Sequence, residues 1–500
     1  MVAILRTLAR HDALFVLDRA APGWSSVLRA LPGLRPRPEM AALSHGRRLA
    51  KAFESLGPGF IKFGQGLSTR SDILGPEMAA DLAELQDRLP PFSGLEARAA
   101  IEAEFGRPVD ELFAAFEDEA IAAASIAQVH FAVLHDNDFG ENDVGENDIA
   151  EFGSREVAVK VLRPDIEAAF ARDLDLFAWL AQMAERLVPK LRRLKPVASV
   201  EIIAATVAME LDLRLEAAAA TELADMFEGS PIYRVPAIHW PLTGRRVMTA
   251  ERIEGIAIHD VDALIEAGFD LQELVGHAAH VFFQQVFVEG FFHADMHPGN
   301  LFVAPDGALV AVDFGIMGRI DKRTRNFLAD ILVGFLGRDY DTVARVHMRA
   351  GFVPADADHG AFEQALRAIG DPILEQPTHE ISIARLLAQL FHVTERFNME
   401  TQPQLLLLQK TMLLAEGMGR KLAPEVNMWF LARPLIEDWM RTHRGVEARV
   451  RDAVEDGLEV IALLPTVIRR LAADPPPPSR RATWPFWLAI AVLAVLVLAA

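Results

Sequence analysis

The sequence predicts an α+β fold of two lobes, in which a sheet forms most of the small lobe and helices form most of the large lobe. Residues 155–162 alternate like a strand and carry a lone Lys160. The polar segment 292–300 is followed by a predicted hairpin that ends at Asp313. Stretches rich in Ala and Leu, which are strong helix formers, lie between and after these segments.

The polar segment carries the most specific pattern. His293 and Asp295 form a His-x-Asp, Asn300 follows five residues after the Asp, and an Asp-Phe-Gly begins at Asp313. A protein kinase holds its phosphoryl donor and metal ions with these parts. Mg²⁺ prefers hard oxygen ligands and keeps the remaining positions for water and phosphate. The pattern therefore predicts a two-lobed protein-kinase-like fold in which Asn300 and Asp313 hold the metal.

The predicted hairpin sets the distance between Asn300 and Asp313. Residues 300–303 and 308–312 are apolar runs, and a Pro-Asp-Gly turn at 305–307 separates them. We therefore expect Asn300 and Asp313 to face one cleft.

Lys160 and Glu216 are the predicted ion pair of the nucleotide site. The strand around Lys160 resembles the Val-Ala-Ile-Lys strand of kinases, whose Lys contacts the α- and β-phosphates when a helical carboxylate holds it. Residues 209–220 read as one helix that supplies Glu216. Glu210 lies six positions earlier, about 600° around that helix, so it needs another partner.

Two further segments are expected to contact a nucleotide. Residues 120–130 stand where a kinase has its Gly-rich phosphate loop, but Ala122, Ala123, Ala124 and Ser125 replace the glycines there. Alanine restricts φ to negative values, so this loop cannot wrap a triphosphate as a Gly-rich loop does. Residues 245–253 read as the strand and hinge between the lobes, and the backbone from Met248 to Glu251 would receive the adenine edge.

A signature at residues 60–70 adds a specific resemblance. It contains Lys-x-Gly-Gln, from Lys62 to Gln65. With this segment, the chain resembles the UbiB family of atypical kinases over most of residues 20–440. The matching positions are Lys62, Gln65, Ala122 to Ser125, Lys160, Glu210, Asp212, Glu216, Asp295, Asn300 and Asp313.

The resemblance implies a regulatory role for the Lys-x-Gly-Gln segment. In the family its helices fold over the site where a kinase would receive a peptide, and the Glu-x-Asp pair, here Glu210 and Asp212, meets them. A buried Lys62 needs an anionic partner to offset its desolvation, and either acid could supply one.

The resemblance also implies a role in aerobic ubiquinone (coenzyme Q) biosynthesis, as a membrane-bound factor that uses ATP or ADP with Mg²⁺. Its partners would be membrane lipids, quinone precursors and the ubiquinone-biosynthesis enzymes. An occluded peptide site and an Ala-rich loop argue against ordinary protein phosphorylation, so an ATPase-like role is favoured. The catalytic Asp295 would then orient water.

The chain departs from the family pattern at 135–148, where a Gly-Glu-Asn-Asp unit repeats in an acidic tract that is expected to be a mobile loop. The gap from Lys160 to Glu216 is long, and helical patterns in 166–194 fill it. The apolar run 405–414 is expected in the core of the large lobe.

Charge and composition exclude several classes. A formal charge of −20 argues against a nucleic-acid partner, because phosphate contacts need concentrated Lys and Arg. With no cysteine, disulfides, thiolate metal sites and Cys nucleophiles are excluded.

The predicted organisation has five parts. An N-terminal helical extension spans 1–110, the small lobe with its helical insertion 111–247, the large lobe 248–440, a helical segment with a Pro-rich linker 441–483, and a C-terminal transmembrane helix 484–500.

The last part determines the predicted location. Residues 484–500 are uncharged, begin with two Trp residues and could span roughly 25 Å as a helix, the lower limit for a bilayer core. Arg residues precede this run, so the positive-inside rule predicts an anchored protein with its catalytic body in the cytoplasm. The resemblance implies that the anchor lies in the inner membrane.

Two alternatives remain open from the sequence. A small-molecule phosphotransferase could share the His-x-Asp-x-His pattern through His297, but such enzymes lack the Lys-x-Gly-Gln segment. A pseudokinase scaffold would bind nucleotide without turnover, although the intact Asp295, Asn300 and Asp313 argue against it.

Overall fold

The computed structural model describes residues 2–15, 36–68, 76–83, 85, 90–135, 155–187, 196–354, 356–374, 386, 389, 397, 403–426, 434–435 and 439. The chain divides into two units, Met1–Pro434 and Leu435–Ala500, and every helix and strand named below belongs to the first. Within the described residues, no helix is long and apolar enough to cross a membrane. The predicted span 484–500, the linker before it and the acidic tract from 136 to 148 lie outside them.

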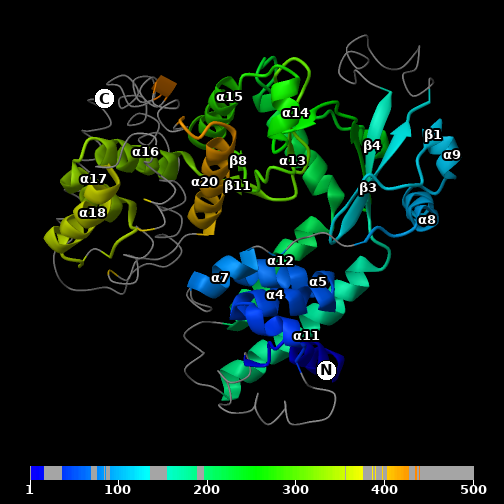
Figure 1. Ribbon diagram of the computed structural model, residues 1–500, viewed down its shortest axis with the longest axis horizontal. Helices are drawn as coiled ribbons and strands as arrows, with labels where there is room; N and C mark the ends of the chain where they lie inside the picture. The colour runs from blue at the N-terminus through cyan, green and yellow to red at the C-terminus, as the bar shows by residue number, and fades with distance from the viewer. Residues whose placement is uncertain are drawn as a thin grey trace, which may run out of the picture. The chain divides into compact units, whose positions relative to one another are not determined.

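A five-stranded antiparallel sheet forms the small lobe (Figure 1). Its strands are β1 (Ala115–Phe116), β2 (Ala122–Ala123), β3 (Ala127–Val133), β4 (Glu156–Leu162) and β6 (Val247–Glu251), in the order β1-β3-β4-β6 with β2 beside β3. Val157, Val159 and Val161 of β4 are fully buried in a core with α8 (Gly94–Phe105) and α9 (Val109–Leu112). Because side chains alternate along a strand, Lys160 projects from the opposite face.

Three helices follow β4, and they correct one prediction. They are α11 (Ile166–Leu187), α12 (Pro196–Glu210) and α13 (Leu213–Met226). Residues 209–220 were expected to form one helix, but α12 ends at Glu210 and Asp212 begins the next helix by accepting a hydrogen bond from the backbone amide of Arg214. Asp favours this N-cap position because its carboxylate satisfies an amide that the helix leaves unpaired. Glu210 and Glu216 therefore belong to different helices.

The N-terminal extension packs on this helical insertion (Figure 1). Its elements are α1 (Val2–Arg10), η1 (Pro38–Ala42), α4 (His45–Leu56), α5 (Pro58–Ser68) and α7 (Pro76–Ala83). The Phe63 ring of α5 stacks on the Phe177 ring of α11 with 4.0 Å between centroids. Offset ring pairs of this kind add about 0.5–1.5 kcal/mol to the area they bury, so this contact helps to hold α5 against α11.

The large lobe contains two small sheets and a helical body. Its elements around the site are β5 (Tyr233–Arg234), β7 (Ile256–Ala257), α14 (Val261–Glu266), α15 (Leu271–Phe283), η5 (Gln284–Glu289), β8 (Phe291–His293), β9 (Leu301–Val303), β10 (Leu309–Ala311) and β11 (Met317–Arg319), while η4 (Trp240–Leu242) packs Leu242 into the small-lobe core. The predicted hairpin is confirmed, because β9 and β10 pair antiparallel across a turn in which Gly307 has φ +88°. The first sheet has four strands in the order β5-β10-β9-β7, and the second is the pair of β8 and β11.

The helical body consists of α16 (Lys322–Leu336), α17 (Tyr340–Ala350), α18 (His359–Leu374) and α20 (Pro403–Leu422). The expected burial of the run 405–414 is confirmed for Leu405, Leu408 and Met412, whereas Lys410 and Leu413 are exposed.

His347 is a buried titratable group in this body, and it makes stability depend on pH. Its ring lies between Phe352 and Phe362, and its Nδ1–H donates to the carbonyl oxygen of Val343 at 2.8 Å. Burial lowers the pKa of His347 to about 4 from its ordinary 6.5. As the pH falls, His347 is therefore protonated in the unfolded chain before it is protonated in the folded chain. The stability contributed by the neutral ring is complete above pH 6.5 and is lost as the pH falls towards 4.

We expect this one group to remove about 2 kcal/mol of stability between pH 7 and pH 5. A His347→Leu variant should show a smaller change in melting temperature over the same pH range. The comparison requires thermal unfolding of both proteins at the two pH values, and equal changes in the two proteins would contradict the assignment.

Candidate active site

Lys160, Glu216 and Asp313 meet in one group. The Lys160 Nζ lies 2.5 Å from the Glu216 Oε1 and 3.5 Å from the Asp313 Oδ1. Strand β4 supplies Lys160, the first turn of α13 supplies Glu216, and the segment after β10 supplies Asp313. The ion pair expected between Lys160 and Glu216 is therefore present. The second contact, between Lys160 and Asp313, joins the small lobe to the start of the Asp-Phe-Gly segment.

Charges within this group determine which side chains are ionised. Burial alone would lower the pKa of the Lys160 ammonium, but the carboxylates of Asp313 and Glu216 together outweigh it and hold that pKa above its ordinary value. The Lys160 ammonium in turn holds the pKa of the Asp313 carboxyl well below its usual range. Asp313 is thus an anion at every pH near neutrality, which a metal ligand requires.

Asn300 and Asp313 are held side by side by the hairpin. Leu301 and Ala311 are register partners, and the Val312 amide donates to the Asn300 carbonyl oxygen at 3.1 Å, so Asp313 follows directly on the residue that faces Asn300. The Gly315 amide fixes the Asp313 Oδ1 at 3.1 Å. The Asp313 side chain stays 45% exposed, which leaves room on its open side for an ion and water.

Asp295 lies in the loop between β8 and β9, and hydrogen bonds between backbone and side-chain atoms hold that loop. The Asp295 amide donates to the Nδ1 of His293 at 3.1 Å, and the His293 amide donates to the Oε1 of Gln285 at 2.9 Å. The Nδ2 of Asn300 reaches the Asp295 carbonyl oxygen at 3.5 Å. Gly290 directly precedes β8 and has φ +74°. A Cβ at this position would lie 2.4 Å from the Ile320 carbonyl oxygen, so only glycine fits.

The sequence missed the partner of Asp295. The Nζ of Lys410, on α20, lies 2.7 Å from the Asp295 Oδ1. The run 405–414 reads as core, and the one signal against that reading is its single cation among apolar side chains.

The Ala-rich segment forms the tight β2–β3 hairpin, which includes the four predicted positions from Ala122 to Ser125. Arg163, just after β4, fixes the turn of this hairpin with two hydrogen bonds. Its Nη2 donates to the Ala124 carbonyl oxygen at 2.9 Å, and its amide donates to the Ile126 carbonyl oxygen at 2.8 Å. The Ser125 hydroxyl is buried and has no hydrogen-bond partner among the residues that the structure describes. An Arg after the Lys strand was not singled out from the sequence.

The residues predicted to contact the adenine lie at the end of the small-lobe sheet. Met248 and Glu251 lie within β6, where Met248 is the register partner of Lys160. The Glu251 amide donates to the Ala237 carbonyl oxygen and the Thr249 carbonyl accepts from the His239 amide, so one edge of this backbone is already bonded. The other edge pairs with β4. The strand predicted within 245–253 is confirmed as β6, and the contact of Met248 to Glu251 with an adenine edge stays a prediction.

The Lys-x-Gly-Gln segment forms α5, and its Lys62 finds the first of the two expected acids. The Lys62 Nζ lies 2.8 Å from the Glu210 Oε2, and the two side chains are only 11% and 9% exposed. Asp212 instead caps α13 and binds the Arg214 guanidinium. Gln65 donates to the Leu85 carbonyl oxygen at 3.3 Å. Lys62 also adds to the lowering of the Asp313 pKa that Lys160 dominates, so its charge reaches the site.

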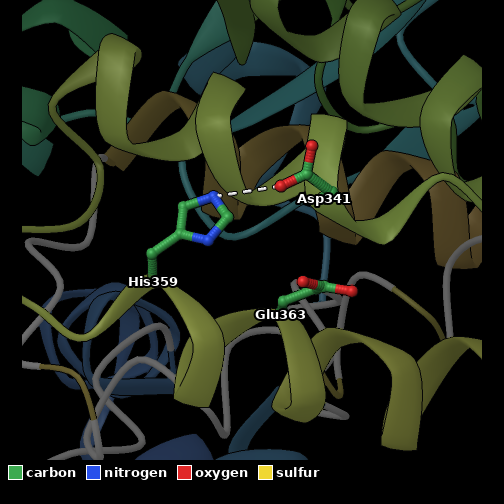
Figure 2. A group of neighbouring side chains, drawn as sticks. All are labelled: Asp341, His359 and Glu363. Atoms are coloured by element: carbon green, nitrogen blue, oxygen red, sulfur yellow. Dashed lines mark ion pairs between the residues drawn. The ribbon is translucent and has the colours of Figure 1, made fainter.

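A second group of possible metal ligands lies on α17 and α18 (Figure 2). Among the described residues, Asp341, His359 and Glu363 could together hold an ion. Both carboxylates already pair with arginines one helical turn away, Asp341 with Arg345 at 2.8 Å and Glu363 with Arg367 at 3.3 Å. Asp341 is also largely exposed, so the arrangement is that of surface ion pairs.

Fold and site together define a kinase-like protein, and comparisons with known proteins give its family. A family model described as the ABC1 atypical kinase-like domain matches residues 84–145 and 147–347, and a model described as the UbiB helical domain matches 366–427. The chain belongs to the UbiB family of atypical kinases.

Curated relatives agree with this assignment. A protein described as "Probable protein kinase UbiB" from Marinobacter nauticus is 44% identical over 422 residues, which cover 84% of this chain and 74% of the relative. One with the same description from Pseudomonas paraeruginosa is 39% identical over 515 residues and covers 100% and 93% of the two chains. A solved complex of Rv3197 with erythromycin from Mycobacterium tuberculosis has a TM-score of 0.47 at 23% identity and covers 74% of this chain and 90% of its own.

Proposed function

We propose that this protein is a membrane-anchored atypical kinase or ATPase that binds Mg²⁺ and ATP and supports aerobic ubiquinone biosynthesis. The observation that carries the proposal is the convergence of an ammonium, Lys160, with the carboxylates of Glu216 and Asp313 beside Asn300. Such a group neutralises phosphate charge from one side and holds a metal ion from the other.

Each residue has a specific part in this proposal. Lys160, fixed by Glu216, would contact the α- and β-phosphates. Asn300 and the ionised Asp313 would hold Mg²⁺, which neutralises charge on the phosphate oxygens when it is bound. The Ser125 hydroxyl in the Ala-rich hairpin has no hydrogen-bond partner among the described residues and could donate to a phosphate oxygen. Asp295 would accept a hydrogen bond from the attacking water or hydroxyl and take its proton.

Hydrolysis coupled to the handling of lipid quinone precursors is favoured over protein phosphorylation. Helix α5 is anchored to α12 by the buried pair of Lys62 and Glu210 and to α11 by the Phe63–Phe177 stack. In the family, this helix lies over the peptide site, and a segment fixed by a buried ion pair is costly to displace. A small-molecule phosphotransferase has no need for such a helix, so this pair also argues against that alternative.

A biochemical and a genetic experiment test the proposal. The purified full-length protein should hydrolyse ATP slowly with Mg²⁺, and faster with lipid vesicles or a phenolic quinone-precursor mimic. Deletion of its gene should lower cellular ubiquinone, and the wild-type gene should restore it whereas Asp295→Asn should not. Unchanged quinone in the deletion would separate the protein from this pathway, and full rescue by Asp295→Asn would exclude the catalytic role.

A further inference from the structure

An ion pair links the helical region 366–427 to the catalytic loop. Lys410, on α20, and Asp295, between β8 and β9, stand far apart in sequence, yet the Nζ lies 2.7 Å from the Oδ1. Neither side chain is enclosed, since Lys410 is 45% and Asp295 31% exposed. Ion pairs this open stabilise a fold by at most about 1 kcal/mol, so stability alone is a weak reason for this contact.

Packing of α20 holds the ammonium in place. The helix contacts α15 and β11, the strand that pairs with β8 just before the catalytic loop. Its buried side includes Leu408, Thr411, Met412 and Ala415, and the Thr411 hydroxyl is turned inward to the Leu407 carbonyl oxygen at 2.9 Å. Lys410 extends from the edge of this packed face, so its backbone is fixed while its four-carbon stem can adjust.

Other ammonium groups described near the site contact different partners, and Lys421 of α20 donates to the His259 carbonyl oxygen at 3.2 Å. Lys160 pairs with Glu216 and Asp313, and Lys62 pairs with Glu210. Within the catalytic loop, His297 turns its Nδ1 back to accept the Gly299 amide at 3.1 Å. Lys410 is therefore the cation that the structure sets beside the carboxylate at which the nucleophile would bind.

A charge at this position matches what phosphoryl transfer requires. During transfer, negative charge spreads over the three equatorial oxygens of the γ-phosphoryl group, in line between the nucleophile and the leaving ADP. A nucleophile held by Asp295 places those oxygens within reach of an ammonium that already contacts the same carboxylate. Positive groups fixed where charge develops are among the largest contributors to catalysis.

We propose that Lys410 is a catalytic residue whose ammonium contacts the γ-phosphoryl oxygens when ATP is bound, so that the helical region completes the active site. The inference rests on the proposed function and adds a residue to it. In the reaction, the bond between the γ-phosphorus and the β,γ-bridging oxygen breaks and its electron pair leaves with ADP. The new bond joins phosphorus to the nucleophile oxygen, whose proton passes to Asp295, and Lys410 stays protonated throughout.

Nucleotide binding distinguishes this role from a purely structural one. The test compares Mg²⁺-ADP with a non-hydrolysable ATP analogue, which keeps the γ-phosphoryl group, by calorimetry on the full-length protein. Lys410→Ala should weaken binding of the analogue about tenfold and change ADP affinity less than twofold, because only the analogue can meet the ammonium. The kcat for ATP hydrolysis should fall about 100-fold, and Lys410→Arg should recover part of both losses.

Arg420→Ala is the matched control, since it removes one positive charge from the same helix, where Arg420 pairs with Glu416 at i,i+4. It should leave both affinities and kcat unchanged. Equal weakening of ADP and analogue by Lys410→Ala, or no weakening of either, would overturn the inference and leave the pair as a tether of α20. If the wild-type protein binds neither nucleotide, the proposed function itself fails, and the inference fails with it.

Discussion

Asp313→Asn is expected to abolish ATP hydrolysis, with a fall in kcat of roughly 10³-fold or more, the scale seen when one essential charge is removed from phosphoryl transfer. The Lys160 ammonium keeps Asp313 ionised, and the Gly315 amide fixes one of its oxygens. Asn has nearly the same shape but no charge, so the variant should fold while it holds Mg²⁺ weakly. Steady-state turnover measured over a range of Mg²⁺ concentrations checks this result.

Asp306→Asn is the control for this experiment. It makes the same chemical change in the same hairpin, at an exposed turn residue that pairs with Arg234. Its turnover should match that of the wild-type protein. If Asp313→Asn retained turnover within tenfold of the wild type at saturating Mg²⁺, Asp313 would not be the metal ligand.

Lys62→Met is expected to destabilise the protein by about 3–5 kcal/mol, because it leaves the Glu210 carboxylate buried without its partner. Both side chains are almost fully enclosed, so water cannot replace the lost ammonium. The melting temperature should drop by roughly 5–10 °C in thermal unfolding. The double variant Lys62→Met/Glu210→Leu should recover most of the loss, since matched apolar groups often replace a buried pair without cost.

Lys51→Met provides the comparison at an exposed pair. Lys51 and Glu54 both lie on the neighbouring helix α4, and their charged atoms are 2.8 Å apart, the same distance as between Lys62 and Glu210. The Lys51 side chain, however, is 55% exposed. Its removal should cost less than about 1 kcal/mol. Similar losses for Lys51→Met and Lys62→Met would show that the Lys62 pair is not the anchor of α5.

Local sequence was enough to predict the catalytic strands and loops. The alternation around Lys160 specifies a strand with one buried face, and the Pro-Asp-Gly turn specifies the register of the following hairpin. That register alone brings Asn300 next to Asp313. These parts were predictable because residues close in sequence determine their geometry.

One error in the helices has a local physical origin. A continuous Ala- and Leu-rich stretch reads as one helix, but Asp212 ends that continuity because its carboxylate caps an amide of the next turn.

Contacts between distant segments were the least predictable. Glu210 and Asp212 were both candidates for the partner of Lys62, and only a family resemblance suggested them, while Lys410 was placed in the core because its neighbours are apolar. Which of several exposed cations reaches a given carboxylate depends on how whole helices dock, and the periodicity of one helix does not contain that information.

The Glu216 carboxylate has a consequence for nucleotide exchange. It accepts from Lys160 of the small lobe and, at 3.4 Å, from the Phe314 amide of the large lobe, so one buried carboxylate bridges the two lobes around the proposed nucleotide site. Swinging the lobes apart would strip this anion of a partner within a low-dielectric interior. Departure of ADP should therefore be slow and limited by the rate of opening, and a membrane component that favours the open form would speed turnover without touching the chemical step.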